Sequence, residues 1–183
     1  MVEAERRLLA NALIDFSNRR VVLLSESCIP LFNFKSIYNY LIRSTASFVE
    51  SYDQLRPVGR GRYDLRIRPY VTRMAEGLPM IFKKHCKPAC YSDEHYLPTM
   101  ITKRSPWKNS NRTLTWVDWS RGGPHPVRFV RTDITPEMLT RMRRDTRCLY
   151  NRRPTRVCHL FAKKFTVIAL DRLMRFAPKI MEF

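Results

Sequence analysis

The sequence predicts an α/β domain. Segments with helical periodicity alternate along the chain with short runs typical of strands, which is the pattern of this fold class. The chain has 183 residues, of which 44% are hydrophobic, so it is long and apolar enough for one packed core. No run of 18 or more apolar residues occurs, and we therefore expect no membrane-spanning segment in this chain.

The first part of the chain has the predicted order helix, strand, turn, helix. Residues 3–16 carry apolar side chains at helical spacing, and FKSIYNYLIR (34–43) predicts a second helix. Between them, RVVLL (20–24) has no polar residue after Arg20 and predicts a buried, central, parallel strand. Ligands of α/β sheets bind beyond the carboxyl ends of strands, so the following residues 25–27 are expected near a cleft. A turn or cap role is the alternative for Glu26.

Two segments in the middle of the chain predict a helix and a strand. DEHYLPTMI (93–101) predicts a helix with Asp93 as its N-cap and Pro98 near its first turn, where a missing N–H matters least. TLTWVDW (113–119) alternates in the manner of a strand.

The C-terminal third predicts two more helices. In DITPEMLTRMRR (133–144), Thr135 is placed as the N-cap and Pro136 at the first helical position. VIALDRLMRFAP (167–178) predicts a final amphipathic helix that stops near its proline.

The charge is strongly basic, with 34 Lys and Arg against 16 Asp and Glu and a net charge of +18. Such an excess implies an anionic partner, which could be nucleic acid, a membrane surface or a phosphate-bearing small molecule. No nucleic-acid-binding motif occurs, and GRGRY (59–63) is not a phosphate loop because no Gly-Lys-Ser/Thr follows it. A nucleic-acid-binding module is therefore the weaker alternative, and we expect no nucleic-acid partner.

The cysteines allow two interpretations. An odd count of five permits two disulfides and one free thiol in an oxidising compartment. A zinc site is the alternative, since His and Cys ligands gather between residues 85 and 95. Its candidate ligands are His85, Cys86, Cys90 and His95. Because no second well-spaced pair accompanies the Cys-x3-Cys, we favour structural or disulfide cysteines and expect no metal.

The acidic pair Asp93–Glu94, followed by His95, is an exception in this basic chain. A carboxylate beside a second acid and a histidine, walled by Tyr91 and Tyr96, could act as a general base. The alternative is that the pair only complements a helix dipole. The chain contains no Asp-x-Asp, so a nucleotide held by a divalent metal is not expected, and Lys and Arg would have to neutralise any bound diphosphate.

The sequence as a whole resembles the plant-type branch of the core-2/I-branching β-1,6-N-acetylglucosaminyltransferase family. The motifs that carry the resemblance run over nearly the whole chain: AERRLLANAL, RVVLLSESCIPLFNF, GRGRY, CYSDEHYLPTM, NRTLTWVDWSRGGPHP and LFAKKF. The resemblance implies a GT-A-like nucleotide-sugar glycosyltransferase fold, with a mixed sheet flanked by helices. It also implies an inverting, metal-independent enzyme of the Golgi lumen that moves N-acetylglucosamine or glucuronic acid from a UDP-sugar to a glycan hydroxyl, without a cofactor.

The resemblance also implies roles for individual residues. Glu94 matches the catalytic base that removes a proton from the acceptor hydroxyl. Lys164 matches the residue that neutralises the leaving diphosphate. Arg131 is the best match to its partner arginine, and Arg128 is the alternative. Trp119 falls at an acceptor-sugar contact.

Two further expectations come with the family. Trp116 is expected in the core rather than at the acceptor. The cysteines become candidates for lumenal disulfides, which draw on Cys86, Cys90, Cys148 and Cys158 without an assigned connectivity.

The sequence departs from the family pattern in two places. The family's catalytic domain begins upstream of AERRLLANAL, and it carries a Lys-Gly-Ser-Gln-Trp-Phe-like stretch between GRGRY and CYSDEH that is missing here. We therefore expect residues 1–183 to be the C-terminal part of a catalytic domain, lacking the upstream donor-binding strands, the membrane anchor and an internal segment. An inactive form, or a non-catalytic relative that pairs with a full-length enzyme, is the alternative.

Overall fold

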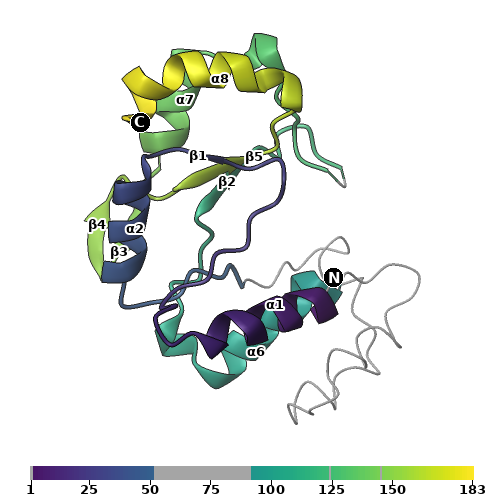
Figure 1. The fold of residues 1–183 in the computed structure, drawn as a ribbon, viewed down its shortest axis with the longest axis vertical. Helices are drawn as coiled ribbons and strands as arrows, with labels where there is room; N and C mark the ends of the chain where they lie inside the picture. Colours follow the sequence, from purple (N-terminus) through teal and green to yellow (C-terminus); the bar gives the residue numbers. More distant parts are fainter. Residues whose placement is uncertain (1, 52–91, 124, 145) are drawn as a thin grey trace. The chain divides into compact units, whose positions relative to one another are not determined.

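The computed structural model describes residues 2–51, 92–123, 125–144 and 146–183 (Figure 1). The chain divides into two compact units. Unit 1 comprises Met1–Val21 and Ala46–Arg112, and unit 2 comprises Val22–Thr45 and Thr113–Phe183. Among the described residues, no helix combines the length and the apolar character that crossing a membrane requires.

The described part of unit 1 contains two α-helices that contact each other, α1 (Val2–Ile14) and α6 (Ser92–Arg104), and α6 is followed by a short 3-10 helix, η2 (Pro106–Lys108). The helix predicted for residues 3–16 is thus confirmed. Its apolar side chains are nevertheless not buried, since Leu8 and Leu13 are 65% and 64% exposed. An apolar stripe remains open on this unit.

The start of α6 differs from the prediction. The helix begins at Ser92, so Asp93 lies in its first turn and is not the N-cap. Pro98 lies inside the helix and not near its start. A proline there removes one main-chain hydrogen bond of the helix, which the sequence rule for first-turn prolines did not anticipate.

Main-chain bonds and asparagine side chains join residues 47–51 of unit 1 to residues 108–111. The N–H of Ser47 donates to the carbonyl of Lys108 at 2.7 Å. Asn109 then bonds both main-chain groups of Val49, its Oδ1 accepting at 3.0 Å and its Nδ2 donating at 2.8 Å. One residue pair further on, the N–H of Ser51 donates to Asn111 Oδ1 at 2.8 Å. These amides take the place of ladder bonds between the two segments.

Unit 2 is built on a three-stranded sheet in the order β1 (Ile29–Pro30), β5 (Phe161–Lys163), β2 (Thr115–Val117). Strand β1 pairs with β5 in antiparallel orientation, whereas β2 pairs with β5 in parallel orientation. The expected α/β class with a mixed sheet is confirmed, and the strand expected within residues 113–119 is β2.

The prediction of a buried strand at residues 20–24 was wrong. No strand is found there, and Val21, Val22, Leu23 and Leu24 are 38–51% exposed. An apolar run becomes a strand only where a neighbouring strand accepts its main-chain bonds, and no described strand pairs with this run. The following residues form a turn, in which the N–H of Cys28 donates to the carbonyl of Ser25 at 3.1 Å.

Two helices of unit 2 start as their sequences predict. Asn33 caps α2 (Phe34–Arg43) by accepting the N–H of Ser36 at 2.8 Å. Thr135 caps α7 (Pro136–Arg144), its Oγ1 accepting the N–H of Met138 at 3.2 Å. The cap expected at Thr135 is therefore confirmed.

The C-terminal helix is longer than its proline suggested. It consists of η4 (Val167–Ala169), α8 (Leu170–Phe176) and a π-helical segment, η5 (Ala177–Met181), which runs past Pro178. Upstream, a 3-10 turn, η3 (Arg131–Asp133), leads into α7. Figure 1 shows α7 and α8 together on one side of the sheet.

A hairpin that the sequence did not reveal completes unit 2. It joins β3 (Cys148–Tyr150) to β4 (Arg153–Thr155), and both turn residues have positive φ, 49° at Asn151 and 66° at Arg152. A disulfide links Cys148 to Cys158, two of the four cysteines expected to form disulfides. Cys28 is a free thiol, while Cys86 and Cys90 lie outside the described residues.

The core of unit 2 lies between the sheet and helices α7 and α8. Phe129 is central to it, with ring-centroid distances of 6.0 Å to Trp116 and 5.3 Å to Phe165. Trp116 is partly buried against the core, as expected. The buried cluster consists of Leu31, Val127, Phe129, Ile134, Leu139, Met142, Ala162, Phe165, Ala169, Leu173, Ala177 and Met181.

Candidate functional site

The parallel strands β2 and β5 end at the same edge of the sheet. Val117 lies opposite Lys163 in the register, so the residues that follow both strands emerge together. They are Asp118 and Trp119 after β2, and Lys164 after β5. The carboxyl ends of parallel strands are where α/β sheets place their ligands. We call the region formed by Asp118, Trp119 and Lys164, together with the neighbouring Arg128, the β2–β5 edge.

The main chain around Lys164 is fixed by three hydrogen bonds. Its carbonyl accepts the N–H of Phe129 at 2.8 Å, and the N–H of Thr166 donates to the carbonyl of Phe129 at 3.0 Å. Between them, the N–H of Phe165 donates to the carbonyl of Ser27 at 3.0 Å. Lys164 is half-buried, and the peptide bond that precedes it is cis. Residues 25–27 thus lie beside this edge, although they form a turn and do not follow a strand.

Arg128 shares the edge with Lys164. Phe129 and Phe165 form a parallel bridge, and both rings are buried in the core. Because side chains alternate along extended chain, Arg128 and Lys164 point away from the core, and continuing the register by one residue places them opposite each other. Two cations in this position repel each other unless an anion lies between them. The alternation in VRFV, with Arg128 between Val127 and Phe129, is the sequence signal for this placement.

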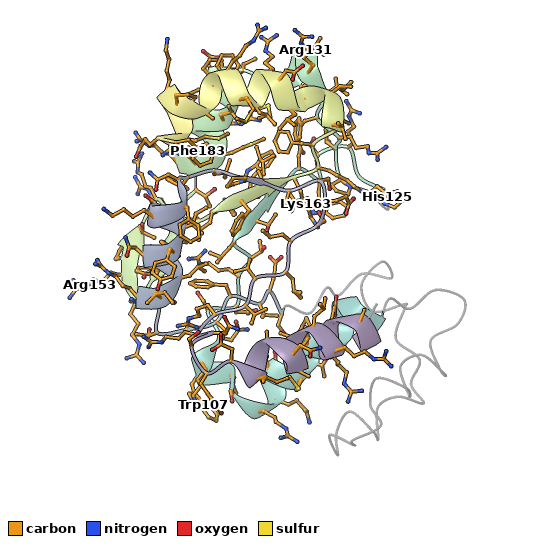
Figure 2. The ribbon with its side chains drawn as sticks, in the orientation of Figure 1. Trp107, His125, Arg131, Arg153, Lys163 and Phe183 are labelled. Carbon is orange, nitrogen blue, oxygen red and sulfur yellow. A yellow bond between two sulfur atoms is a disulfide. The ribbon has the colours of Figure 1, made fainter. Side chains whose placement is uncertain are left out.

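Arg131, the arginine preferred in the sequence analysis, lies two residues beyond Phe129. It opens η3 and is exposed. Figure 2 shows Arg131 next to α8, apart from Lys163 at the end of β5. The register therefore favours Arg128 over Arg131 as the neighbour of Lys164. The role of Arg131 in neutralising the diphosphate together with Lys164 stays a prediction.

Trp119 lies on a loop that Asp118 closes at its base. The carbonyl of Asp118 accepts the N–H of Val127 at 2.9 Å, and its Oδ1 accepts the N–H of Ser120 at 2.8 Å. The Ser120 hydroxyl, and then the Ser120 N–H, hold the pKa of the Asp118 carboxyl below its ordinary value. Within the loop, the N–H of Gly122 donates to the carbonyl of Trp119 at 2.9 Å. Trp119 is 54% exposed on this supported loop, so its indole is available to a ligand.

The side chains of the predicted base and of the alternative zinc ligands lie outside what the structure describes. Glu94 lies in the first turn of α6 in unit 1, and its side chain, like that of His95, lies outside what the structure describes. His85, Cys86 and Cys90 also lie outside the described residues. Within the described part of the chain, no three His, Cys, Asp or Glu side chains gather in a way that could hold a metal ion. The role of Glu94 stays a prediction.

The model of the Core-2/I-Branching enzyme family matches residues 1–80 and 76–143 of this chain. The chain belongs to this family. It is also similar to glycosyltransferase BC10 of Oryza sativa subsp. japonica, with 31% identity over 238 aligned positions that cover 95% of this chain and 58% of the rice protein. The chain thus spans somewhat more than half the length of that relative. No solved structure matches it.

The two matched stretches of the Core-2/I-Branching model overlap at residues 76–80. This overlap lies between GRGRY and CYSDEH, where the absence of an internal segment stays a prediction. The alignment with the rice protein is longer than this chain, so the rice protein has residues inside the aligned region that have no counterpart here. Lys164 lies beyond the residues that the family model matches.

Proposed function

We propose that this chain is part of a glycosyltransferase catalytic domain that moves a sugar from a UDP-sugar to a glycan hydroxyl, with inversion and without a metal ion. The observation that carries the proposal is the β2–β5 edge, where Trp119, Arg128 and Lys164 emerge together in a member of the Core-2/I-Branching enzyme family. An aromatic face beside paired cations suits a ligand that joins a sugar to a diphosphate.

The donor half of the proposal rests on charge. Departure of UDP leaves a diphosphate whose negative charge must be stabilised, and in the absence of a metal ion this falls to Lys and Arg. Lys164 takes this role together with an arginine, for which the chain offers Arg128 by register and Arg131 by resemblance. Each charge-assisted contact of this kind contributes about 1.5–3 kcal/mol.

The acceptor half rests on Glu94 and Trp119. Glu94 removes the proton of the acceptor hydroxyl as its oxygen attacks the anomeric carbon from the face opposite UDP, which inverts the configuration. The exposed indole of Trp119 stacks on a pyranose ring of the acceptor or donor. Donors that carry N-acetylglucosamine or glucuronic acid both fit this proposal.

We place the reaction in the Golgi lumen, by resemblance to the family. The disulfide between Cys148 and Cys158 supports an oxidising compartment, because such bonds are rare in the cytosol. We further propose that residues 1–183 are a partial catalytic domain, in line with the 58% of the rice protein that they span.

A second candidate function is that of a non-catalytic partner of a full-length enzyme. The uncovered apolar surfaces of both units favour it. Leu8 and Leu13 of α1 are about two-thirds exposed, as is Ile168 at the start of the last helix, and Val167 is 89% exposed. Such surface suits association with another polypeptide.

Transfer assays with the 183-residue chain test the proposal. UDP-N-acetylglucosamine and UDP-glucuronic acid are supplied with neutral glycan acceptors in EDTA, and Glu94→Gln is compared with Asp93→Asn. We expect Glu94→Gln to lower kcat by about 100-fold or more, because a general base contributes on that order, and Asp93→Asn to change it little. Equal turnover of both variants would contradict the role of Glu94. A wild-type chain that shows no transfer but co-purifies with a full-length family member would support the second candidate.

A further inference from the structure

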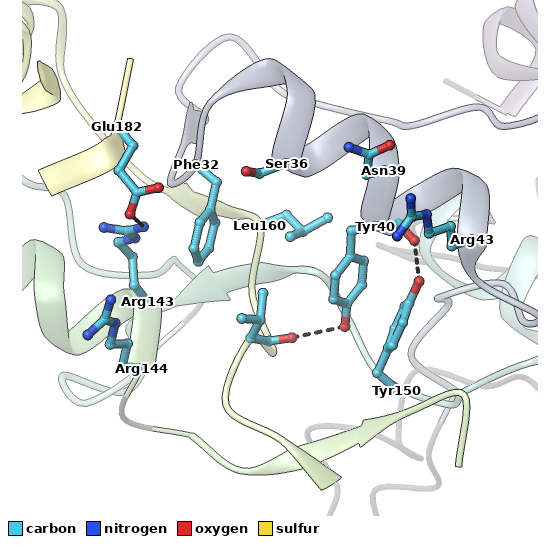
Figure 3. A pocket seen from close by; sticks show the side chains of 11 residues that line it. Phe32, Ser36, Asn39, Tyr40, Arg43, Arg143, Arg144, Tyr150, Leu160 and Glu182 are labelled. Atoms are coloured by element: carbon cyan, nitrogen blue, oxygen red, sulfur yellow. Dashed lines mark hydrogen bonds and ion pairs between the residues drawn. The ribbon is translucent and has the colours of Figure 1, made fainter. Parts of the chain in front are cut away.

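Unit 2 contains a pocket of about 470 Å³ that the proposed function does not use (Figure 3). Helix α2, the end of α7, the β3–β4 hairpin and the residues just before β5 line it. Leu160 in its wall precedes β5, whereas Lys164 follows it, so the pocket and the β2–β5 edge lie at opposite ends of one strand. Four residues of extended chain separate them by roughly 13 Å.

The most unusual side chain of the pocket is Arg143, which is only 6% exposed. Its guanidinium stands 4.3 Å from the ring centroid of Phe32, and its Nη2 donates to Glu182 Oε1 at 3.1 Å. A guanidinium has five N–H donors, and the buried Nε of Arg143 has no hydrogen-bond partner among the described residues. Glu182 itself is 60% exposed, so its hold on Arg143 is weakened by water. A buried cation with so few partners is suited to receive an anion.

The charge around the pocket points the same way. Arg43 and Arg144 also line it, and both are exposed. Three guanidiniums thus surround a pocket whose described lining contains one carboxylate, that of Glu182. The remaining positive charge attracts an anionic ligand, and the planar fork of arginine suits a carboxylate in particular.

Two tyrosines form a rigid wall of the pocket. Tyr40 and Tyr150 have ring centroids 4.1 Å apart. Their hydroxyls are bonded to main chain, since Tyr40 Oη donates to the carbonyl of Val157 at 2.9 Å and Tyr150 Oη donates to the carbonyl of Tyr40 at 2.8 Å. Figure 3 shows both bonds and the two rings side by side. The rings are held in place and offer apolar faces, as a sugar or another flat ring requires.

Hydroxyl-binding groups stand next to these rings. Ser36 and Asn39, both on α2, also line the pocket. A hydroxyl and an amide both donate and accept hydrogen bonds, so they suit the hydroxyl groups of a sugar. The lining thus combines arginines, aromatic faces and hydroxyl-binding groups.

We propose that this pocket binds a sugar acid. Its carboxylate meets Arg143 and Arg144 in competition with Glu182, its ring lies against the tyrosines, and its hydroxyls meet Ser36 and Asn39. The proposal does not depend on the transferase reaction, because none of these residues belongs to the β2–β5 edge.

Ligand-observed NMR and calorimetry on the 183-residue chain test the proposal with three probes. Glucuronate carries both features, glucose lacks the carboxylate, and benzoate lacks the hydroxyls. We expect glucuronate to bind at least about ten-fold more tightly than either of the others, since each loses one class of contact. Equal binding of glucose would overturn the role of the arginines. Equal binding of benzoate would overturn recognition of a sugar.

Variants then locate the binding. Arg144→Gln, an exposed change, is expected to weaken glucuronate binding about ten-fold, and Arg143→Lys, which keeps the charge but loses the fork, is expected to weaken it similarly. Glu182→Gln removes the competing carboxylate and is expected to tighten binding. Arg153→Gln, an exposed arginine of β4 outside the pocket, and Lys164→Ala should leave it unchanged. Loss of binding in Lys164→Ala with no effect of Arg144→Gln would place the ligand at the β2–β5 edge and overturn the proposal.

Discussion

Phe129 and Lys164 are joined through their main chains, with the N–H of Phe129 donating to the carbonyl of Lys164 at 2.8 Å. Together with the return bond from Thr166, this makes residues 128–130 run parallel to residues 164–166. Phe129 lies in the core, so the bond anchors the edge at which the two cations stand. The proposed function requires that these two cations, Arg128 and Lys164, bind a diphosphate.

The same geometry predicts which arginine works with Lys164. Arg128→Gln should weaken UDP binding by about ten-fold or more, because one charge-assisted contact is lost. Arg131→Gln is expected to have the smaller effect, since Arg131 lies farther along the chain, on η3. Isothermal titration with UDP in EDTA measures both. Both arginines are exposed, so neither change should alter stability, and a larger loss in Arg131→Gln would restore the assignment made from the family resemblance.

The side chain of Asn151 is expected to stabilise unit 2. Its Oδ1 accepts from the N–H and the hydroxyl of Thr45 at 2.9 and 3.0 Å, and its Nδ2 donates to the carbonyl of Arg43 at 2.9 Å, at the end of α2. Asn151→Ala should lower the free energy of unfolding by about 1–2 kcal/mol, measured by urea denaturation, since these exposed bonds are lost.

Asn151→Gly separates the bonds from the backbone conformation. Asn151 has a φ of 49°, which glycine adopts at no steric cost and alanine does not. The glycine variant should therefore lose somewhat less stability than the alanine variant. If both variants matched the wild type, the hydrogen bonds at the end of α2 would contribute nothing measurable.

The disulfide between Cys148 and Cys158 is expected to stabilise the folded protein, because it lowers the conformational entropy of the unfolded chain. The two cysteines are 10 positions apart, and closing a loop of this size contributes about 2–3 kcal/mol. The double change Cys148→Ser with Cys158→Ser should lower the free energy of unfolding by that amount. Cys28→Ser, at the free thiol, is the matched control and should have little effect. Unchanged stability after loss of the disulfide would contradict the prediction.

Asp118 predicts a pH dependence of stability. Its pKa is lowered below 3.8, mainly by the Ser120 hydroxyl and N–H, so the ionised carboxylate favours the folded state. This contribution is fully present above pH 3.8 and is lost as the pH falls through the folded-state pKa. The difference in stability between the wild type and Asp118→Asn should therefore shrink below about pH 4. Thermal unfolding between pH 2.5 and 7 measures it, and a constant difference over that range would exclude the carboxylate as its source.

Local signals predicted several elements correctly. Helix α2 was predicted from its sequence pattern, and α7 from its pattern and the cap Thr135, which acts within a few residues. The strand β2 follows from alternation. Such signals depend only on residues that are close in the sequence, so they can be recognised in a single sequence.

Features that depend on distant partners could not be predicted in the same way. The run at 20–24 has strand composition but no described strand to pair with. The β3–β4 hairpin escaped notice because its turn is Asn151–Arg152, without the glycine that usually marks such turns. The pocket unites Tyr40 with Tyr150, which are 110 positions apart, and only folding brings them together. Lys164 was singled out through the family resemblance alone, whereas the acidic pair Asp93–Glu94 in a basic chain already marked a possible base in the local sequence.

The most direct measurement is thermal unfolding of the 183-residue chain with increasing UDP in EDTA, for the wild type, Lys164→Ala and the control Lys179→Ala. A ligand that binds only the folded state raises the stability by about 2.7 kcal/mol at a hundred times its Kd. We predict a cooperative transition whose Tm rises with UDP in the wild type and in Lys179→Ala, which changes an exposed lysine of η5. In Lys164→Ala, the same rise in Tm should need at least about ten-fold more UDP. A Tm of the wild type that does not change with UDP would contradict a donor site at the β2–β5 edge. The same would follow if the Tm of Lys164→Ala rose with UDP as much as that of the wild type.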